Sequence, residues 1–524
     1  MAFSSNSASI SLLLIVLVWG FQFSFSEGFG TFGFDVHHRY SDTVKGILGV
    51  DGLPEKGSVD YYAAMAHRDH LLRGRHLAET TAAAPAPLTF SGGNETYQIP
   101  LFGYLYYANV TVGSPGLWFL VALDTGSDLF WLPCDCTSCI KAVKTPSGQV
   151  VKFNIYSPNT SSTSEAVSCN STFCEQPRQC SSRRHTCVYQ VQYLSSNTSS
   201  TGLVVEDILH LTTDDSQLKV IDAQVPLGCG IVQTGALLKG AAPNGLFGLG
   251  MNDISVPSVL ASKGLTTNSF SMCFGTDGYG RMSFGDTGSA GQGQTPFNVV
   301  QSDPTYNVTV TKVSVGNNVT NISFSALFDS GTSFTNLNDP AYTIISEMFD
   351  SQAKETRHSS SDSQIPFEYC YDPSANQSKP PPLNLTMKCG DQFSVTAPIV
   401  EVSLQNGRNV SCLALFKSED INIIGKNFMT GYSIVFDREN MVLGWEASNC
   451  YGTESSTTLY PPESSAMRPT ALPPTSLNLE ATTEVSPTFK LSPPNDSTRL
   501  KSSIFTLFAV IFTALIHCLI IGSS

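Results

Sequence analysis

Three kinds of hydrophobic and polar pattern follow one another along this chain of 524 residues. From Tyr97 to Cys450, short runs of Val, Ile, Tyr and Phe alternate with Gly, Asn, Ser and Pro, which predicts an all-β fold. Before it, Tyr61 to Leu77 predicts a helix that ends at an Ala- and Pro-rich stretch, and no strand is expected ahead of Tyr97. After it, half of the positions in 451–500 are Ser, Thr or Pro, so this segment is expected to form an extended stalk.

Apolar runs mark both ends of the chain. Ile10 to Trp19 has the length of the hydrophobic part of a secretory signal peptide, with cleavage expected after about Ser26. Ile504 to Ile521 is a longer run near the C-terminus, preceded by small residues and a short spacer. This order is the signal for a glycosylphosphatidylinositol (GPI) anchor, with Asn495 or Ser497 as the attachment site. A single transmembrane helix is the alternative.

Composition places the body of the protein outside the cell. Only 14% of residues are charged, and the net charge of -14 argues against a nucleic-acid binder, which needs a basic surface. Thirteen of the 14 cysteines lie between Cys134 and Cys450, which indicates disulfides in an oxidising compartment. Asn-x-Ser/Thr triplets, the acceptors of N-linked glycans, occur at Asn94, Asn109, Asn159, Asn170, Asn197, Asn307, Asn318, Asn321, Asn376, Asn384, Asn409 and Asn495.

The β region contains an internal near-repeat. Residues 119–127 read FLVALDTGS, and residues 325–332 read SALFDSGT. Each is followed later by a segment of two apolar residues and a glycine, NGLFGLG at 244–250 and NIIGKNF at 422–428. Two related β lobes are therefore expected.

The repeated Asp suggests a catalytic pair. An apolar strand delivers its terminal Asp from a buried position, and the glycine lets the chain turn tightly beneath it. Two such strands facing each other would bring Asp124 and Asp329 within a few ångströms, where two like charges share one proton. The ionised partner can then take a proton from water, while the protonated partner polarises an amide. This chemistry needs no metal, cofactor or covalent intermediate.

Several long segments together resemble a known family. They are YYANVTVGSPG (106–116), LDTGSDLFWLPC (123–134), GCG (228–230), FDSGTSFT (328–335) and IVFDRENMVLGW (434–445). The chain resembles the pepsin-type aspartic proteases, specifically their atypical, nepenthesin-like plant branch, and is similar to the GPI-anchored group of aspartyl protease family proteins. The resemblance covers the chain from about His37 to Cys450 and implies a bilobal, mainly β fold with the active site between the lobes.

The resemblance implies a role for each matching residue. Asp124 and Asp329 would form the catalytic dyad, supported by the glycines and hydroxyls beside them. Tyr193 would be the tyrosine of a mobile flap over the substrate, and Trp131 its hydrogen-bond neighbour. Cys370 and Cys412 would form a disulfide. The supporting residues are Thr125 and Ser330, which would link the two loops, Ser127 and Thr332, which would bond the outer carboxylate oxygens, and the turn residues Gly126 and Gly331.

The same resemblance divides the chain into segments. After the signal peptide (1–26) would come a propeptide (27–95), an N-terminal lobe (96–300) and a C-terminal lobe (301–450). A stalk (451–497) and a removed GPI signal (498–524) would follow.

Some features allow two interpretations. Cys134, Cys136 and Cys139 have a spacing that could bind zinc, but disulfides with nearby cysteines are expected in a secreted chain. The count of thirteen leaves one thiol over, and Cys389 is the expected one. In the flap, a glycan on Asn197 is expected to restrict large substrates at the mouth of the cleft.

The predicted propeptide carries basic and titratable groups. His37 and His38 suggest a packing or pH-sensing role rather than a metal site or a base. The stretch His67 to Arg75 is either a solvated helix face or a segment that lies near the acidic cleft at neutral pH and loosens when carboxylates protonate.

The sequence therefore predicts a monomeric, extracellular aspartic endopeptidase, held on the outer leaflet of the plasma membrane by a GPI anchor and active on peptides at acidic pH. A single-pass membrane protein or one released from the cell are the alternatives for location. A non-catalytic surface binding or inhibitor-like protein on the same fold is the alternative function, and a lectin-like adhesion protein is a further one.

Overall fold

The structure, a computed structural model, describes most of residues 31–450. Gaps inside this range are 40, 49–53, 73–87, 90–95, 98–104, 145–149, 175–179, 181–184, 194–197, 214–218, 276–278, 299–303, 359–364, 374–379, 405 and 420. The predicted signal peptide, stalk and GPI signal lie outside the described residues. Among the residues that are described, no helix is long and apolar enough to cross a membrane.

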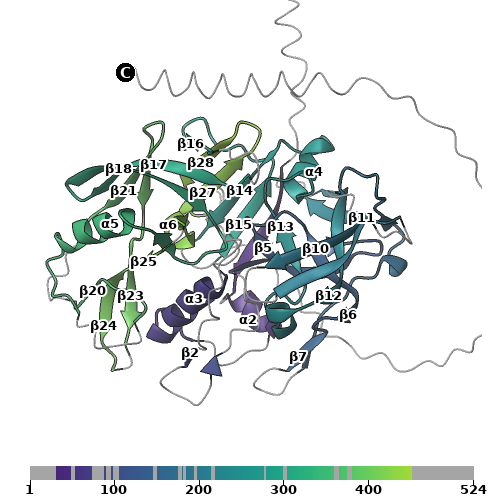
Figure 1. Ribbon diagram of the computed structural model, residues 1–524, viewed down its shortest axis with the longest axis horizontal. Coiled ribbons are helices and arrows are strands. Elements are labelled where there is room, and N and C mark those ends of the chain that lie inside the picture. The colour runs from purple at the N-terminus through teal and green to yellow at the C-terminus, as the bar shows by residue number, and fades with distance from the viewer. Residues whose placement is uncertain are drawn as a thin grey trace, which may run out of the picture. The chain divides into compact units, whose positions relative to one another are not determined.

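A 14-stranded sheet forms the largest part of the fold (Figure 1). Its order is β10 (Val188–Tyr193), β11 (Thr198–Thr212), β12 (Val220–Gln233), β6 (Trp131–Ser138), β13 (Leu246–Gly248), β5 (Leu117–Asp124), β4 (Tyr106–Val112), β1 (Phe32–His38), β15 (Tyr279–Phe284), β14 (Ser269–Phe274), β27 (Tyr432–Asp437), β28 (Val442–Ala447) and β16 (Gly293–Pro296), with β9 (Glu165–Ala166) beside β11. Strands from both halves of the sequence thus share one sheet.

A seven-stranded sheet is built from the second half of the sequence alone. Its order is β22 (Gln392–Val395), β21 (Leu383–Met387), β17 (Asn307–Val315), β18 (Asn318–Phe328), β26 (Ile423–Ile424), β19 (Thr335–Leu337) and β25 (Leu415–Lys417). Smaller sheets are β20 (Cys370–Tyr371), β24 (Asn409–Leu413) and β23 (Ile399–Ser403); β2 (Leu88–Thr89) with β3 (Thr96–Tyr97); and β7 (Ala142–Lys144) with β8 (Val150–Lys152). The prediction of a mainly β fold is confirmed.

The helices are short and few among the described residues. They are α2 (Asp42–Leu48), α3 (Val59–Leu72), α4 (Val256–Ser262), α5 (Ala341–Asp350) and α6 (Lys426–Met429), with 3-10 turns at Pro158–Thr160 and Gly235–Lys239. The predicted helix at Tyr61 to Leu77 corresponds to α3, which begins two residues earlier; residues 73–77 are outside the described part. The hydrophobic core joins the two halves, because Phe270 of β14 stacks on Phe436 of β27 at 4.7 Å between ring centroids.

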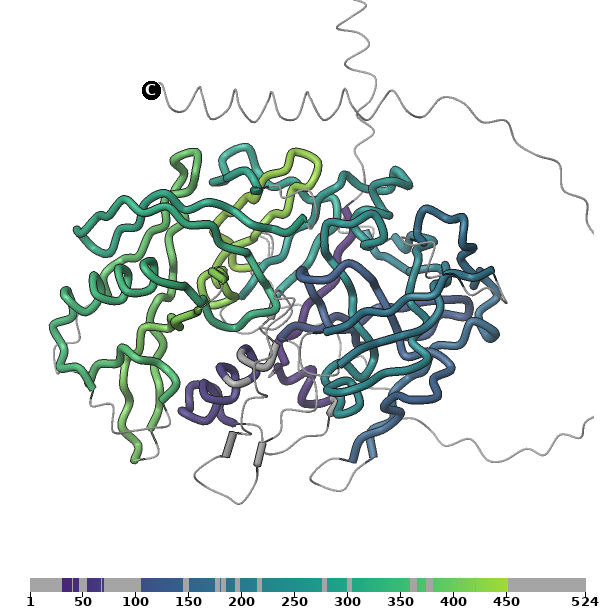
Figure 2. The backbone as a smooth tube through the Cα atoms, in the orientation of Figure 1, coloured from purple at the N-terminus to yellow at the C-terminus, as the bar shows by residue number. Residues whose placement is uncertain are grey.

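The strand β1 corrects the expectation that no strand precedes Tyr97. It pairs antiparallel with β15, Phe32 opposite Phe284, and with β4, His38 opposite Tyr106. Its apolar residues alternate with polar or small ones, so the period-2 signal was present in the sequence. Figure 2 shows this purple segment in the middle of the fold.

Candidate active site

The two Asp residues lie at the ends of equivalent strands. Asp124 ends β5, whose last six residues are buried, and Asp329 directly follows β18. The apolar-apolar-glycine segments predicted from the near-repeat lie beside them. Strand β13 runs parallel to β5 with Gly248 opposite Asp124, and β26 runs parallel to β18 with Ile424 opposite Phe328. Both halves therefore hold their Asp in the same way.

Each carboxylate accepts a backbone and a hydroxyl hydrogen bond from the residues that follow it. Asp124 accepts from the Gly126 N–H at 3.1 Å and from the Ser127 hydroxyl at 2.9 Å. Asp329 accepts from the Gly331 N–H and from the Thr332 hydroxyl, both at 2.7 Å. The two carboxyl groups are buried, and these donors fix the orientation of both.

The two Asp loops are in direct contact. The hydroxyls of Thr125 and Ser330, each one residue after its Asp, lie 3.5 Å apart. This contact joins residues 205 positions apart in sequence. The structure thus brings together the two loops that the near-repeat predicted to face each other.

Glycines allow the close approach of the segments that support these loops. A Cβ on Gly248 would lie 2.3 Å from the backbone carbon and oxygen of Asp128. A Cβ on Gly425 would lie 2.6 Å from the carbonyl carbon of Phe334. The second contact reproduces the first in the other half of the chain.

Gly248→Ala is expected to lower the free energy of unfolding by roughly 1–3 kcal/mol, because the added methyl group must push the backbone of the Asp124 loop aside. Urea unfolding measures the effect. Gly291→Ala is the control, since its Cβ would meet no described atom within 4 Å, and a change within about 0.5 kcal/mol is expected there. Equal effects of the two substitutions would contradict the close packing.

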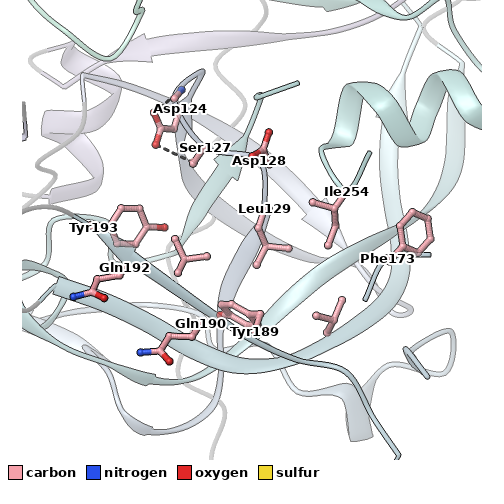
Figure 3. Close-up of a pocket in the computed structure, with 13 residues that line it drawn as sticks. Asp124, Ser127, Asp128, Leu129, Phe173, Tyr189, Gln190, Gln192, Tyr193 and Ile254 are labelled. Carbon is pink, nitrogen blue, oxygen red and sulfur yellow. Dashed lines mark hydrogen bonds between the residues drawn. The ribbon is translucent and has the colours of Figure 1, made fainter. Parts of the chain in front are cut away.

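The hairpin of β10 and β11 carries Tyr193, the predicted flap tyrosine. Its hydroxyl accepts a hydrogen bond from the indole N–H of Trp131 at 2.7 Å. A pocket of about 240 Å³ opens between this hairpin and Asp124, and its lining residues come from the first half of the chain (Figure 3). The expected glycan at Asn197 falls on residues outside the described part.

The loop of Asp329 is covered by α3. The guanidinium of Arg68 donates to the carbonyl oxygen of Gly331 at 2.8 Å and to the carboxylate of Asp69 at 2.6 Å. Asp69 in turn accepts from the N–H groups of Ser333 at 2.8 Å and Phe334 at 3.1 Å. Both side chains are buried. Burial raises the pKa of Asp69, while Arg68 and the donors on Ser333 and Phe334 oppose the rise.

Aromatic packing extends this contact along α3. The ring of Tyr62 lies 5.7 Å from that of Phe367 and 6.1 Å from that of Phe334, centroid to centroid. The sequence left open whether the stretch His67 to Arg75 is a solvated helix face or lies near the cleft, and it did not single out Asp69. A helix sequence alone gives no indication of which loop its buried ion pair will meet.

Comparisons with known proteins agree with this geometry. Family models described as "Xylanase inhibitor N-terminal" and "Xylanase inhibitor C-terminal" match residues 106–286 and 305–447. "Aspartyl protease family protein 1" of Arabidopsis thaliana is 55% identical over 474 residues, 90% of this chain and 91% of that protein. "Aspartic proteinase-like protein 1" of the same plant is 39% identical, covering 79% of this chain and 80% of that protein. The chain belongs to the plant pepsin-like aspartic protease family.

A solved structure supports the fold. Basic 7S globulin from soybean superposes with a TM-score of 0.51 at 20% identity, covering 67% of this chain and 92% of that one. The expectation of a bilobal pepsin-like aspartic protease fold is thereby confirmed.

Six disulfides are described in this member of the plant pepsin-like aspartic protease family. They are Cys134–Cys229, Cys136–Cys139, Cys169–Cys180, Cys174–Cys187, Cys273–Cys450 and Cys370–Cys412. The last is the bridge that the family resemblance implied. Cys134 pairs far along the sequence rather than with a nearby cysteine, because β6 and β12 are neighbours in the sheet. Cys389 is also disulfide-bonded, so the expectation that it is the unpaired thiol is wrong.

The described glycosylation triplets of this family member lie mainly on the surface. Asn109, Asn159, Asn170, Asn318, Asn321 and Asn409 are exposed, and Asn307 and Asn384 are partly exposed. Asn94, Asn197, Asn376 and Asn495 lie outside the described residues.

Proposed function

We propose that this protein is an aspartic endopeptidase. The observation that carries the proposal is the pair of Asp loops, each held by a glycine N–H and a hydroxyl and joined through Thr125 and Ser330. Strongly oriented carboxyl groups of this kind suit general acid and base catalysis. The protease names of its relatives support the same assignment.

In the proposed reaction, a water molecule lies between Asp124 and Asp329, of which one is ionised and one protonated. The ionised carboxylate takes a proton from the water. At the same time, the oxygen of the water bonds to the amide carbon of the substrate. The protonated carboxyl gives its proton to the carbonyl oxygen. The tetrahedral intermediate then collapses: the carboxyl that took the water proton gives it to the nitrogen, and the C–N bond breaks. The other carboxylate takes a proton back from a hydroxyl of the intermediate, so a carboxylic acid and an amine leave and the dyad is restored.

The reaction is tested with the purified, secreted protein at pH 3–5 on a denatured protein substrate, with and without the transition-state analogue pepstatin. We expect cleavage that pepstatin abolishes. Cleavage insensitive to pepstatin would indicate a contaminating protease, and no cleavage would contradict the proposal.

Binding without catalysis is the alternative function, favoured by the inhibitor names of the two matching family models. The presence of both Asp residues with their supporting donors weighs against it. A protein that binds pepstatin but cleaves nothing would establish this alternative.

We further propose that residues 27–95 are a pro-segment that keeps the precursor inactive. The support is the packing of α3 on the Asp329 loop through Arg68 and Asp69. The same boundaries as expected from the sequence are proposed for the remaining segments: the signal peptide (1–26), the lobes (96–300 and 301–450), the stalk (451–497) and the GPI signal (498–524). The protein is accordingly proposed to be an N-glycosylated monomer that is held on the outer face of the plasma membrane.

Acid is expected to release this pro-segment through His38 of β1. Its imidazole is buried, and the centroid of the Tyr106 ring lies 5.4 Å from its own. Positive charges that repel a protonated imidazole come from Lys426, Arg39, Arg68 and Lys56. Burial, and then these charges, hold its pKa well below the usual range. The docked pro-segment therefore resists protonation, whereas the undocked one takes up a proton near pH 6.5. Docking is expected to weaken as the pH falls below about 6.5.

Asp69 acts in the opposite direction. Because its pKa is raised in the docked state, its contribution favours docking at low pH and is lost as the pH rises through that pKa. Protonation of Asp69 is thus not expected to loosen the docked pro-segment. Of His38 and Asp69, the histidine is the group through which acid weakens docking.

His38→Gln is expected to flatten the pH dependence of pro-segment release between pH 6.5 and 4. For the wild type, docking should weaken by up to about tenfold per pH unit in this range. Limited proteolysis of the precursor across pH measures release, and the exposed His185→Gln is the control. A precursor no better inhibited at pH 7 than at pH 4 would contradict the mechanism.

A further inference from the structure

Phe173 stands on a short turn tied to the flap hairpin by a disulfide. The N–H of Cys174 bonds the carbonyl of Ser171 at 3.0 Å, closing the turn. Cys174 is bonded to Cys187, which immediately precedes β10. The aromatic ring is therefore fixed relative to the strand that carries Tyr189 and Tyr193.

The turn places this ring in the wall of the pocket beside Asp124. Figure 3 shows Asp124 and Ser127 at one end of the group of lining residues and Phe173 at the other, with Leu129 and Ile254 between them. Tyr189 forms part of the same wall. The pocket thus begins at a reacting carboxyl group and ends at an aromatic ring.

Aliphatic side chains form part of the wall, beside the polar Gln190 and Gln192 of β10. Leu129, Val204 and Ile254 contribute aliphatic surface, and the described lining contains no Lys or Arg. The carboxylate of Asp128 accepts hydrogen bonds from the backbone N–H and side-chain amide of Asn252, at 2.9 and 2.8 Å. The acidic group next to the dyad is thus already engaged.

We propose that Phe173 is a specificity-determining residue, which closes the far end of a subsite for an apolar side chain next to the scissile bond. This inference rests on the proposed endopeptidase function. A cavity of about 150 Å³ holds a benzene molecule, so the volume of about 240 Å³ accommodates a leucine or phenylalanine side chain. A longer side chain would meet the ring of Phe173.

The proposal gives the disulfide-held turn a role in substrate selection. The size of residue 173 sets the length of the subsite, while the disulfide keeps that residue from moving away with a large substrate. A hydrophobic pocket discriminates by about 10–200-fold for each methylene added or lost. Substitutions at this position should therefore change the ranking of substrates rather than activity in general.

The test uses the secreted protein after acid activation and peptides that differ at either residue flanking the scissile bond: Val, Leu, Phe or naphthylalanine. At one of these two residues, Phe173→Ala is expected to raise the kcat/KM ratio of the naphthylalanine to the Leu peptide about tenfold. Phe173→Trp is expected to lower that ratio by a similar factor. Thr172→Ala, an exposed position on the same turn, should leave it unchanged.

A binding measurement separates this proposal from the proposed function. The Kd values of uncleavable statine peptides with the same side chains do not depend on turnover and should follow the same order. If the wild type binds them but cleaves nothing, the endopeptidase proposal fails while the subsite can still be judged. Thermal unfolding first shows that both Phe173 variants are folded. If each variant then changes kcat/KM and Kd by the same factor for every peptide, the subsite proposal is overturned.

Discussion

Asp124→Asn is expected to lower kcat/KM for a peptide substrate by about 10³-fold or more, because the amide can neither take a proton from water nor return it. The substitution is nearly isosteric, and Asn retains an oxygen that can accept the Ser127 hydroxyl bond. Loss of activity would then be chemical rather than structural. The measurement is hydrolysis of a fluorogenic peptide at pH 4 by the activated protein.

Asp329→Asn should have an effect of the same size, since the two residues act as one unit. The double variant should be little worse than either single one, as expected of groups that serve a single step. Asp222→Asn is the control, because that side chain on β12 is 59% exposed. If the Asp124 and Asp329 variants kept wild-type activity, neither residue would be catalytic.

Arg68→Ala is expected to activate the precursor at neutral pH. The substitution would leave the carboxylate of Asp69 buried without its cation, and breaking a buried ion pair in this way costs about 3–5 kcal/mol. Docking of α3 on the Asp329 loop would weaken by roughly a hundred- to several thousand-fold. Peptide hydrolysis at pH 7 by the unprocessed precursor should rise, and backbone amides of α3 should exchange faster with solvent.

The matched control is Asp60→Asn on the same helix, a partly exposed carboxylate. It should leave the precursor inactive at pH 7. An Arg68→Ala precursor with wild-type latency and wild-type exchange in α3 would show that the helix is not the inhibitory element. Fast exchange without activity would mean that α3 leaves the site but some other segment still blocks it.

The paired Asp loops were predictable because they depend on local sequence repeated twice. An apolar run ending in Asp-Thr-Gly or Asp-Ser-Gly specifies a buried strand, a tight turn and an oriented carboxylate with little help from the rest of the chain. The later apolar-apolar-glycine segments were also visible, and their place beside Asp124 and Asp329 follows from the same repeat.

The contacts that we propose to control access were not predictable in the same way. Arg68 and Asp69 are adjacent and opposite in charge, so in sequence they resemble a solvated surface pair. Only the tertiary fold reveals that they face Gly331 and Ser333, more than 260 positions away. Phe173 gave no signal either, because its place in the pocket depends on the pairing of Cys174 with Cys187.

Because β1 pairs with both β4 and β15, removal of the proposed pro-segment would take an interior strand out of the large sheet. If cleavage near residue 95 released everything before it, the backbone groups of Val36, His37 and their neighbours would be withdrawn from between β4 and β15. Two interior strands would then become sheet edges, which attract other chains and promote aggregation. A mature protein that does not aggregate must therefore either retain β1 as a separate, non-covalently bound peptide or insert another part of its own chain between β4 and β15.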